Sequence, residues 1–97
     1  MLNVEKGVLA EVKSDVPGGK SLIDWLNDET EFKEKFIGKR IEGLKATGLI
    51  GKIHKFVLSI PEDIMNGLTV DEIKSIVKEV LKEKGVDWEV EVLIIKR

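Results

Sequence analysis

The chain has 97 residues, of which 42% are hydrophobic and 35% are charged, and its formal net charge is −2. These values indicate one globular domain, residues 1–97, and exclude a net charge that would by itself draw the chain to nucleic acid or to an anionic membrane. The absence of cysteine excludes disulfides, thiolate nucleophiles and zinc–thiolate sites.

The first predicted element is a strand from about residue 4 to residue 13. Its small apolar residues alternate with polar ones at Val4, Val8, Ala10 and Val12. Gly7 stands where a β-bulge would fit. A glycine-rich segment, residues 14–21, follows this strand.

The second predicted element is a helix that begins after Ser21, whose hydroxyl suits an N-cap. Apolar residues continue at helical spacing as far as Phe36. The segment Asn27-Asp28-Glu29-Thr30, however, has the polar composition of a cap. The sequence therefore leaves two alternatives open, which are one helix to about residue 36 or two short helices with a break near Asp28.

Residues 37–60 are predicted to form a β-hairpin. Glycines at positions 43 and 48 interrupt the pattern, and Thr47-Gly48-Leu49-Ile50-Gly51 is typical of a turn. The two strands would be 39–46 and 52–60. Phe56, Leu58 and Ile60 form the strongest inward-facing set, and Pro61 ends the second strand.

The C-terminal third predicts a helix over residues 70–84 and a strand over residues 86–96. Thr69 and Glu72 have the spacing of a capping box, and Gly85 suits the end of the helix. The strand is apolar on one face and turns apolar on its second face at Leu93 and Ile95. We therefore expect its C-terminal half to be covered on both sides.

The element order is strand, helix, strand, strand, helix, strand. This order predicts an α+β domain with the ferredoxin-like split βαβ arrangement, a four-stranded antiparallel sheet with two helices on one face. The arrangement is an analogy at the level of the fold, and it implies no function.

The glycine-rich segment resembles part of a phosphate-binding loop. Gly19, Lys20 and Ser21 match the end of the Walker A pattern, but Ser14 replaces the first glycine and Pro17 removes one backbone amide. We predict no nucleotide hydrolysis here. One alternative function is the binding of a phosphate or another small anionic ligand by Gly18, Gly19, Lys20 and Ser21. The simpler interpretation is a turn that leads to an N-cap serine.

A second candidate site is the basic segment 37–60, which holds five Lys or Arg residues and a single acid, Glu42, for a local net charge of +4. The remaining chain must then carry −6, because the total is −2. Such asymmetry is typical of nucleic-acid binding, although Phe56 is the single aromatic residue available for stacking. The alternative is a set of solvated lysines that protects a sheet edge. The candidate residues are Lys39, Arg40, Lys45, Lys52, His54 and Lys55.

No catalytic or metal-binding constellation is evident, and no cofactor is predicted. His54 is the only histidine, and the carboxylates show no metal-ligand spacing. The strand 88–95 is dense in β-formers and is expected at a sheet edge, where it could pair with a second copy. The leading prediction is therefore a small non-catalytic binding or assembly module that forms a homodimer by sheet extension or sheet-face packing.

Two further expectations concern location and source. Residues 1–6 do not resemble a signal peptide, and no apolar run approaches the ~20 residues that span a bilayer, so we expect a cytoplasmic protein without a membrane partner. Charge is carried mainly by Lys and Glu, and glutamine is absent, a bias that favours a thermophilic source.

Overall fold

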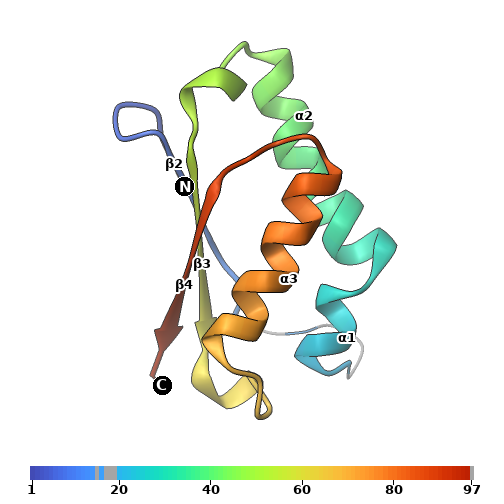
Figure 1. Cartoon of the computed structure of the whole chain (residues 1–97). Coiled ribbons are helices and arrows are strands. Elements are labelled where there is room, and N and C mark those ends of the chain that lie inside the picture. Colours follow the sequence, from blue (N-terminus) through green and yellow to red (C-terminus); the bar gives the residue numbers. More distant parts are fainter. Residues whose placement is uncertain (15, 17–19, 97) are drawn as a thin grey trace.

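The computed structural model describes residues 1–14, 16 and 20–96 of the chain. These residues form two layers, a four-stranded sheet in the order β1-β2-β3-β4 and a layer of helices on one of its faces (Figure 1). The α+β class and the placement of the helices on one face agree with the sequence. The course of the strands does not.

The N-terminal segment forms a short hairpin rather than one bulged strand. β1 (Leu2–Asn3) pairs antiparallel with β2 (Val8–Val12). Gly7 lies in the turn between them, with a φ of +68° that side chains rarely adopt. A Cβ at this position would lie 2.4 Å from Cδ2 of His54, so the ring of His54 occupies the space that the glycine leaves.

The break near Asp28 is present. α1 (Leu22–Leu26) ends at Asn27, and Asp28 caps a π-helix, η2 (Glu29–Gly38). In this helix Lys33 N–H donates to the carbonyl of Asp28, five residues earlier, at 3.2 Å. Of the two alternatives, the one with two separate helices is correct.

The predicted strand 39–46 is wrong, because α2 (Lys39–Ala46) continues directly from η2 as a helix. Ile37, Ile41 and Leu44 recur at helical spacing and are all buried. Gly43 interrupts this apolar pattern in the sequence, but it faces open space on the helix surface. A glycine there destabilises the helix by only about 1 kcal/mol relative to alanine. A short 3₁₀ turn, η3 (Ile50–Lys52), then leads to β3 (Lys55–Pro61).

The C-terminal elements agree closely with the sequence. A 3₁₀ turn, η4 (Glu62–Ile64), precedes α3 (Val70–Glu83), whose capping box is complete, since Glu72 N–H donates to Oγ1 of Thr69 and Thr69 N–H donates to Oε1 of Glu72. Gly85 follows α3 with a φ of +84°. The final strand, β4 (Glu89–Ile95), is an outer strand of the sheet.

The sheet is mixed, so the purely antiparallel ferredoxin-like arrangement is not the one observed. β1 and β2 are antiparallel, whereas β2, β3 and β4 run parallel to one another. The reason is α2. Because residues 39–46 are helical, the chain crosses from β2 to β3 through the helical layer and enters β3 in the same direction. The connection through α3 repeats this course from β3 to β4 (Figure 1).

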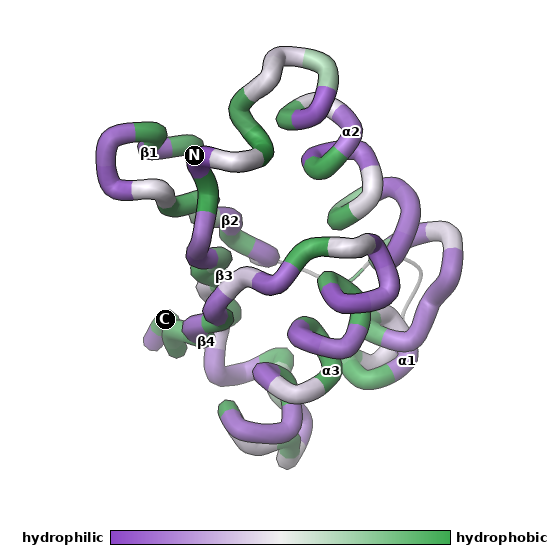
Figure 2. The backbone as a smooth tube through the Cα atoms, turned by 45° about the horizontal axis from the view of Figure 1, so that its top comes forward, coloured by the Kyte–Doolittle hydropathy of each residue, from purple (hydrophilic) through white to green (hydrophobic). Residues whose placement is uncertain are grey.

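The core lies between the sheet and the helices. Hydrophobic and hydrophilic segments alternate along α3, as expected for a helix with one buried face (Figure 2). Trp25 and Phe32 pack with ring centroids 4.7 Å apart, and Phe36 lies against both rings. The largest described side chains with an exposed fraction below 2% are Trp25, Phe32, Phe56, Leu22, Leu26, Ile37, Leu58, Ile60, Ile73, Leu81, Val77 and Pro61.

Candidate interaction surface

Among the residues that the structure describes, no helix lies on one face of the sheet. Leu9, Phe56 and Val90 are buried against the helical layer, and successive side chains alternate between faces, so the register places the intervening residues on the opposite face. We name this side the open face. It is formed by Val8, Ala10, Val12, Lys55, Val57, Ser59, Glu89, Glu91, Leu93 and Ile95.

The open face has a charged end and an apolar end. Lys55 and Glu91 form an ion pair of 3.3 Å near the start of β3 and β4. The C-terminal ends of the strands present Val12, Leu93 and Ile95 instead. Val12 is 59% exposed and Leu93 is 46% exposed. The expectation that the C-terminal half of the last strand is covered on both sides is therefore wrong for this single chain.

β2 has the reverse of the orientation that its alternating pattern favours. Its alternating apolar set, Val8, Ala10 and Val12, faces away from the helices, whereas Glu11 faces toward them. The Glu11 carboxylate, 15% exposed, accepts a hydrogen bond from Nε of Arg40. A strand with one buried face normally shows the reverse arrangement, with apolar residues toward the core. The sequence signal for this orientation is Leu9, which stands outside the alternating set and is the residue that enters the core.

The edge of β4 is also uncovered. Ile94 follows Leu93 on the other face of the strand and is 42% exposed. Adjacent residues of a strand point to opposite faces, so both faces of β4 are accessible at this position. We name the open face and the edge of β4 together the uncovered side of the sheet.

The six basic residues predicted for nucleic acid do not lie on a hairpin. Lys39, Arg40 and Lys45 belong to α2, Lys52 to η3 and Lys55 to β3, and His54 directly precedes β3. Lys55 is on the open face, whereas α2 belongs to the helical layer, so the two sets lie on opposite sides of the sheet. The hairpin is thus wrong, and the predicted footprint is divided.

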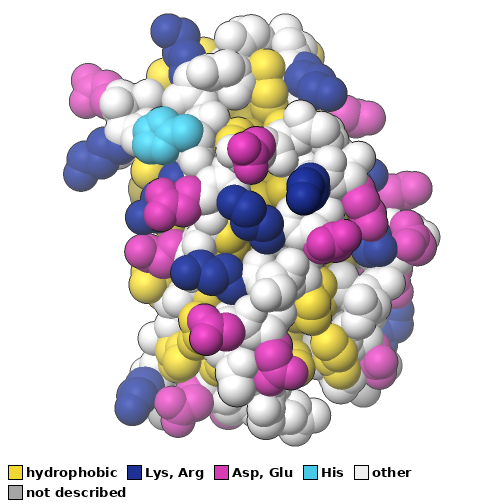
Figure 3. All heavy atoms as spheres, viewed as in Figure 1, with side chains coloured by type: hydrophobic (Ala, Val, Ile, Leu, Met, Phe, Trp, Pro, Cys, Tyr) yellow, Lys and Arg dark blue, Asp and Glu magenta, His cyan; other side chains and the backbone are white. Residues whose placement is uncertain are grey.

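Two of these cations also have partners within the chain. Arg40 binds Glu11, donates to the carbonyl of Phe36 at 2.7 Å and lies 4.4 Å from the centre of the Phe36 ring. Partial burial lowers the pKa of its guanidinium. Lys55 binds Glu91. On the side seen in Figure 3, cationic and acidic side chains alternate, and no patch of one sign forms.

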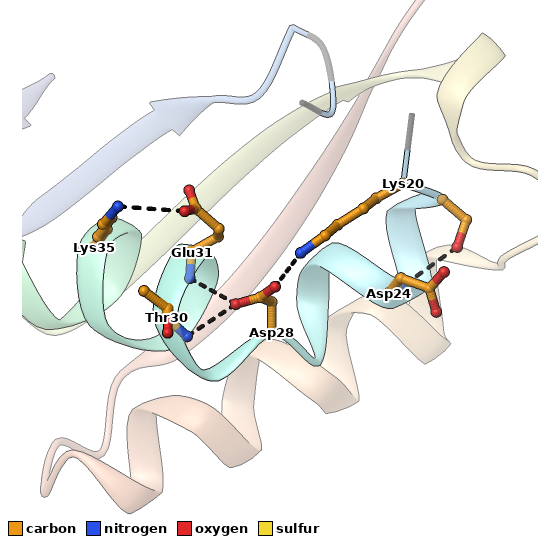
Figure 4. A network of polar contacts seen from close by, with 7 residues as sticks. Lys20, Asp24, Asp28, Thr30, Glu31 and Lys35 are labelled. Carbon is orange, nitrogen blue, oxygen red and sulfur yellow. Dashed lines mark hydrogen bonds and ion pairs between the residues drawn. The ribbon is translucent and has the colours of Figure 1, made fainter. Parts of the chain in front are cut away.

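Within the glycine-rich segment, Gly18 and Gly19 lie outside the described residues. Ser21 caps α1 and accepts from Asp24 N–H at 3.3 Å, as predicted for an N-cap. The Lys20 ammonium donates to the carboxylate of Asp28 (Figure 4), and this hydrogen bond raises the pKa of Lys20. An anionic ligand would therefore compete with Asp28 for Lys20.

Asp28 organises the start of η2. Its Oδ1 accepts from the backbone N–H groups of Thr30 and Glu31 at 2.9 and 2.8 Å (Figure 4). The hydrogen bond from Glu31, followed by that from Lys20, holds the pKa of Asp28 at about 2. The network is thus local, and it joins α1 to η2.

Open clefts of about 260 to 410 Å³ lie between described residues. One of about 280 Å³ lies between α3 and the junction of α1 with η2, and it includes Asn27, Lys33 and Ile76 in its lining. Another of about 260 Å³ lies beyond the carboxyl ends of β2 and β3, where α/β sheets bind ligands, and Lys20, Ser21 and Asp63 line it. Because an acid faces this second cleft and Lys20 is bonded to Asp28, anion binding there stays a prediction of the sequence.

Among the described residues, no three His, Asp or Glu side chains gather as a metal site would require. None of the described helices has the length and apolar content to cross a membrane. No family model, no curated protein and no solved structure matches the chain.

Proposed function

We propose that this protein is a non-catalytic binding and assembly module that associates with a second copy of itself through the uncovered side of its sheet. The observation that carries the proposal is the orientation of β2, whose apolar residues Val8, Ala10 and Val12 point away from the helices. An exposed apolar face is typical of a surface that is buried against a partner in the functional state.

The direction of the strands supports the same proposal. Sheets made entirely of parallel strands occur almost only where both faces are covered, and most of this sheet is parallel. Here β2, β3 and β4 are parallel and have helices on one face. A second copy would supply the missing cover and would enlarge the small core that a chain of this length can build.

The composition of the surface supports the same proposal. Val57, Leu93 and Ile95 continue the apolar set across β3 and β4, while Lys55 and Glu91 pair with each other at one end. Protein interfaces place apolar residues at the centre and charged residues at the rim. The open face has both kinds of residue, the apolar ones toward the C-terminal ends of its strands and the charged ones toward their start.

Sedimentation velocity over a range of about 1 to 500 μM tests the proposal, because this range covers micromolar dissociation constants. We expect the mass to rise toward that of a dimer with concentration. Leu93→Lys is expected to remain a monomer, because Leu93 belongs to both the open face and the edge of β4. Ala46→Lys adds the same charge at an exposed position of α2 and should associate as the wild type does. A wild-type chain that stays folded and monomeric throughout would refute the proposal.

A further inference from the structure

The contact between two copies can be specified further from the open face. We infer that two chains pack these faces against each other as a closed dimer, with the strands of the two copies running in opposite directions. The row of Val12, Ser59 and Leu93, named here the apolar row, lies at the centre of this contact. The inference rests on the proposed assembly function and adds its geometry.

The apolar row crosses the three parallel strands at one level. Val12 is the partner of Ser59 in the register of β2 with β3, and Ser59 is the partner of Leu93 in that of β3 with β4. Val12 is 59% exposed and Leu93 is 46% exposed. A strand added beside β4 would leave Val12 in water, because Val12 is two strands away from that edge. A partner that lies on the open face covers both side chains.

The helical layer offers no apolar counterpart to the open face. Among the described residues, every large hydrophobic side chain that is exposed lies in the sheet or in the turn of its first hairpin, and none lies on a helix. These side chains are Met1, Leu2, Val4, Val12, Leu93 and Ile94. The sheet of one copy therefore finds apolar surface on a second copy only at the sheet of that copy. A contact between identical surfaces closes as a two-fold dimer, whereas a contact between different surfaces continues into larger assemblies.

The two ends of the open face differ, and this difference selects the direction of the second copy. Lys55, Glu89 and Glu91 stand at the start of β3 and β4, with one positive and two negative charges. Packed sheets keep their strands within about 30° of each other, so the two-fold axis runs either nearly along the strands or nearly across them. An axis along the strands would place one charged end on the other. The excess carboxylate of each copy would then be buried between the sheets, which is costly.

An axis across the strands, at the level of the apolar row, avoids this cost. It places the apolar row of one copy over that of the other and reverses the strand direction. The charged ends then lie at opposite rims of the contact, where Lys55 stays bound to Glu91 and Glu89 stays exposed. The like charges of the two copies are also kept apart. Apolar residues at the centre and charged residues at the rim are typical of protein interfaces.

Cross-linking tests whether the two faces meet. The chain has no cysteine, so Val12→Cys carries a single thiol. Packed sheets lie about 10 Å apart, so a bismaleimide with a spacer of about 10 Å can join the two thiols. Ala46→Cys, at an exposed position of α2, is the control for random collision. At a concentration where the wild type sediments as a dimer, we expect most of the Val12→Cys chain and little of the Ala46→Cys chain to run as a covalent dimer on a denaturing gel.

A spin label on Glu89→Cys tests the direction of the second copy. Glu89 is exposed and lies outside the centre of the contact, so the label should leave association intact. With a rise of about 3.3 Å per residue, an axis across the strands at Leu93 separates the two Glu89 Cα atoms by about 28 Å. An axis along β3 would bring them to about 14 Å. Double electron–electron resonance distinguishes these distances, and we expect the longer one.

The possible results also separate the inference from the proposed function. If the wild type sediments as a dimer but Val12→Cys cross-links no better than Ala46→Cys, contact between the open faces is wrong while assembly stands. A separation near about 14 Å between the Glu89 labels would overturn the reversed direction. A wild-type mass that continues to rise beyond that of a dimer would overturn the closed dimer. A wild-type monomer at all concentrations would refute both the inference and the proposed function.

Discussion

Phe32 is the side chain on which the packing of the helical layer should depend most strongly. It is fully buried in the π-helix η2, with its ring centroid 4.7 Å from that of Trp25 and 5.8 Å from that of Phe36. Replacing a buried Phe by Ala costs about 3–5 kcal/mol, because apolar contacts are lost and a cavity remains. A domain of this size has about 5–15 kcal/mol of stability in total, so Phe32→Ala removes a large part of it.

Urea unfolding measures this loss, with circular dichroism and tryptophan fluorescence as independent probes. At about 4–8 °C per kcal/mol, the melting temperature should fall by at least about 12 °C. Phe36→Ala is the matched control. Phe36 belongs to the same cluster but is only partly buried. We therefore expect Phe36→Ala to lower the free energy of unfolding by about half as much as Phe32→Ala. A loss below about 1 kcal/mol for Phe32→Ala, or a larger loss for Phe36→Ala, would show that η2 does not pack as described.

Three further predictions concern local features. The Asp28 carboxyl has a pKa of about 2 in the folded chain against an ordinary value of 3.8. Its contribution to the free energy of unfolding is therefore complete above pH 4 and is lost as pH falls toward 2. Asp28→Asn should make the free energy of unfolding depend less on pH in this window. Gly7→Ala should destabilise the chain by more than about 1 kcal/mol, because φ is positive and His54 fills the space, whereas Gly51→Ala, at an open position, should be neutral or slightly stabilising in the same melts. Because the basic residues are divided between two sides of the sheet, titration with a labelled single-stranded oligonucleotide at low salt should show no binding tighter than about 1 μM, and tight, strongly salt-dependent binding would instead support a nucleic-acid function.

The candidate surface could be predicted from the sequence only in part. The β-rich terminal strand and its edge position were both evident, and β4 is an outer strand. The apolar set of β2 was equally visible, but its alternation cannot say which face turns toward the helices. Leu9 decides this, because the larger side chain fills the core while Arg40, from a distant helix, neutralises Glu11.

The basic segment shows the opposite case. Its charge excess is a property of the sequence, but a site requires that the charges meet in space. α2 carries Lys39, Arg40 and Lys45 within the helical layer, whereas β3 carries Lys55 on the open face. Proximity along the chain therefore did not become proximity in the fold.

The sequence by itself determined the elements whose signals are local. The capping box at Thr69, the left-handed Gly85 and the N-caps at Ser21 and Asp28 each depend on residues within about one helical turn. Only the tertiary structure decided that residues 39–46 are a helix, that β2, β3 and β4 are parallel, and that Leu93 is uncovered. These outcomes depend on burial against segments far away in the sequence, and the free energy of that burial exceeds the weak local preference of a short stretch that contains Gly43.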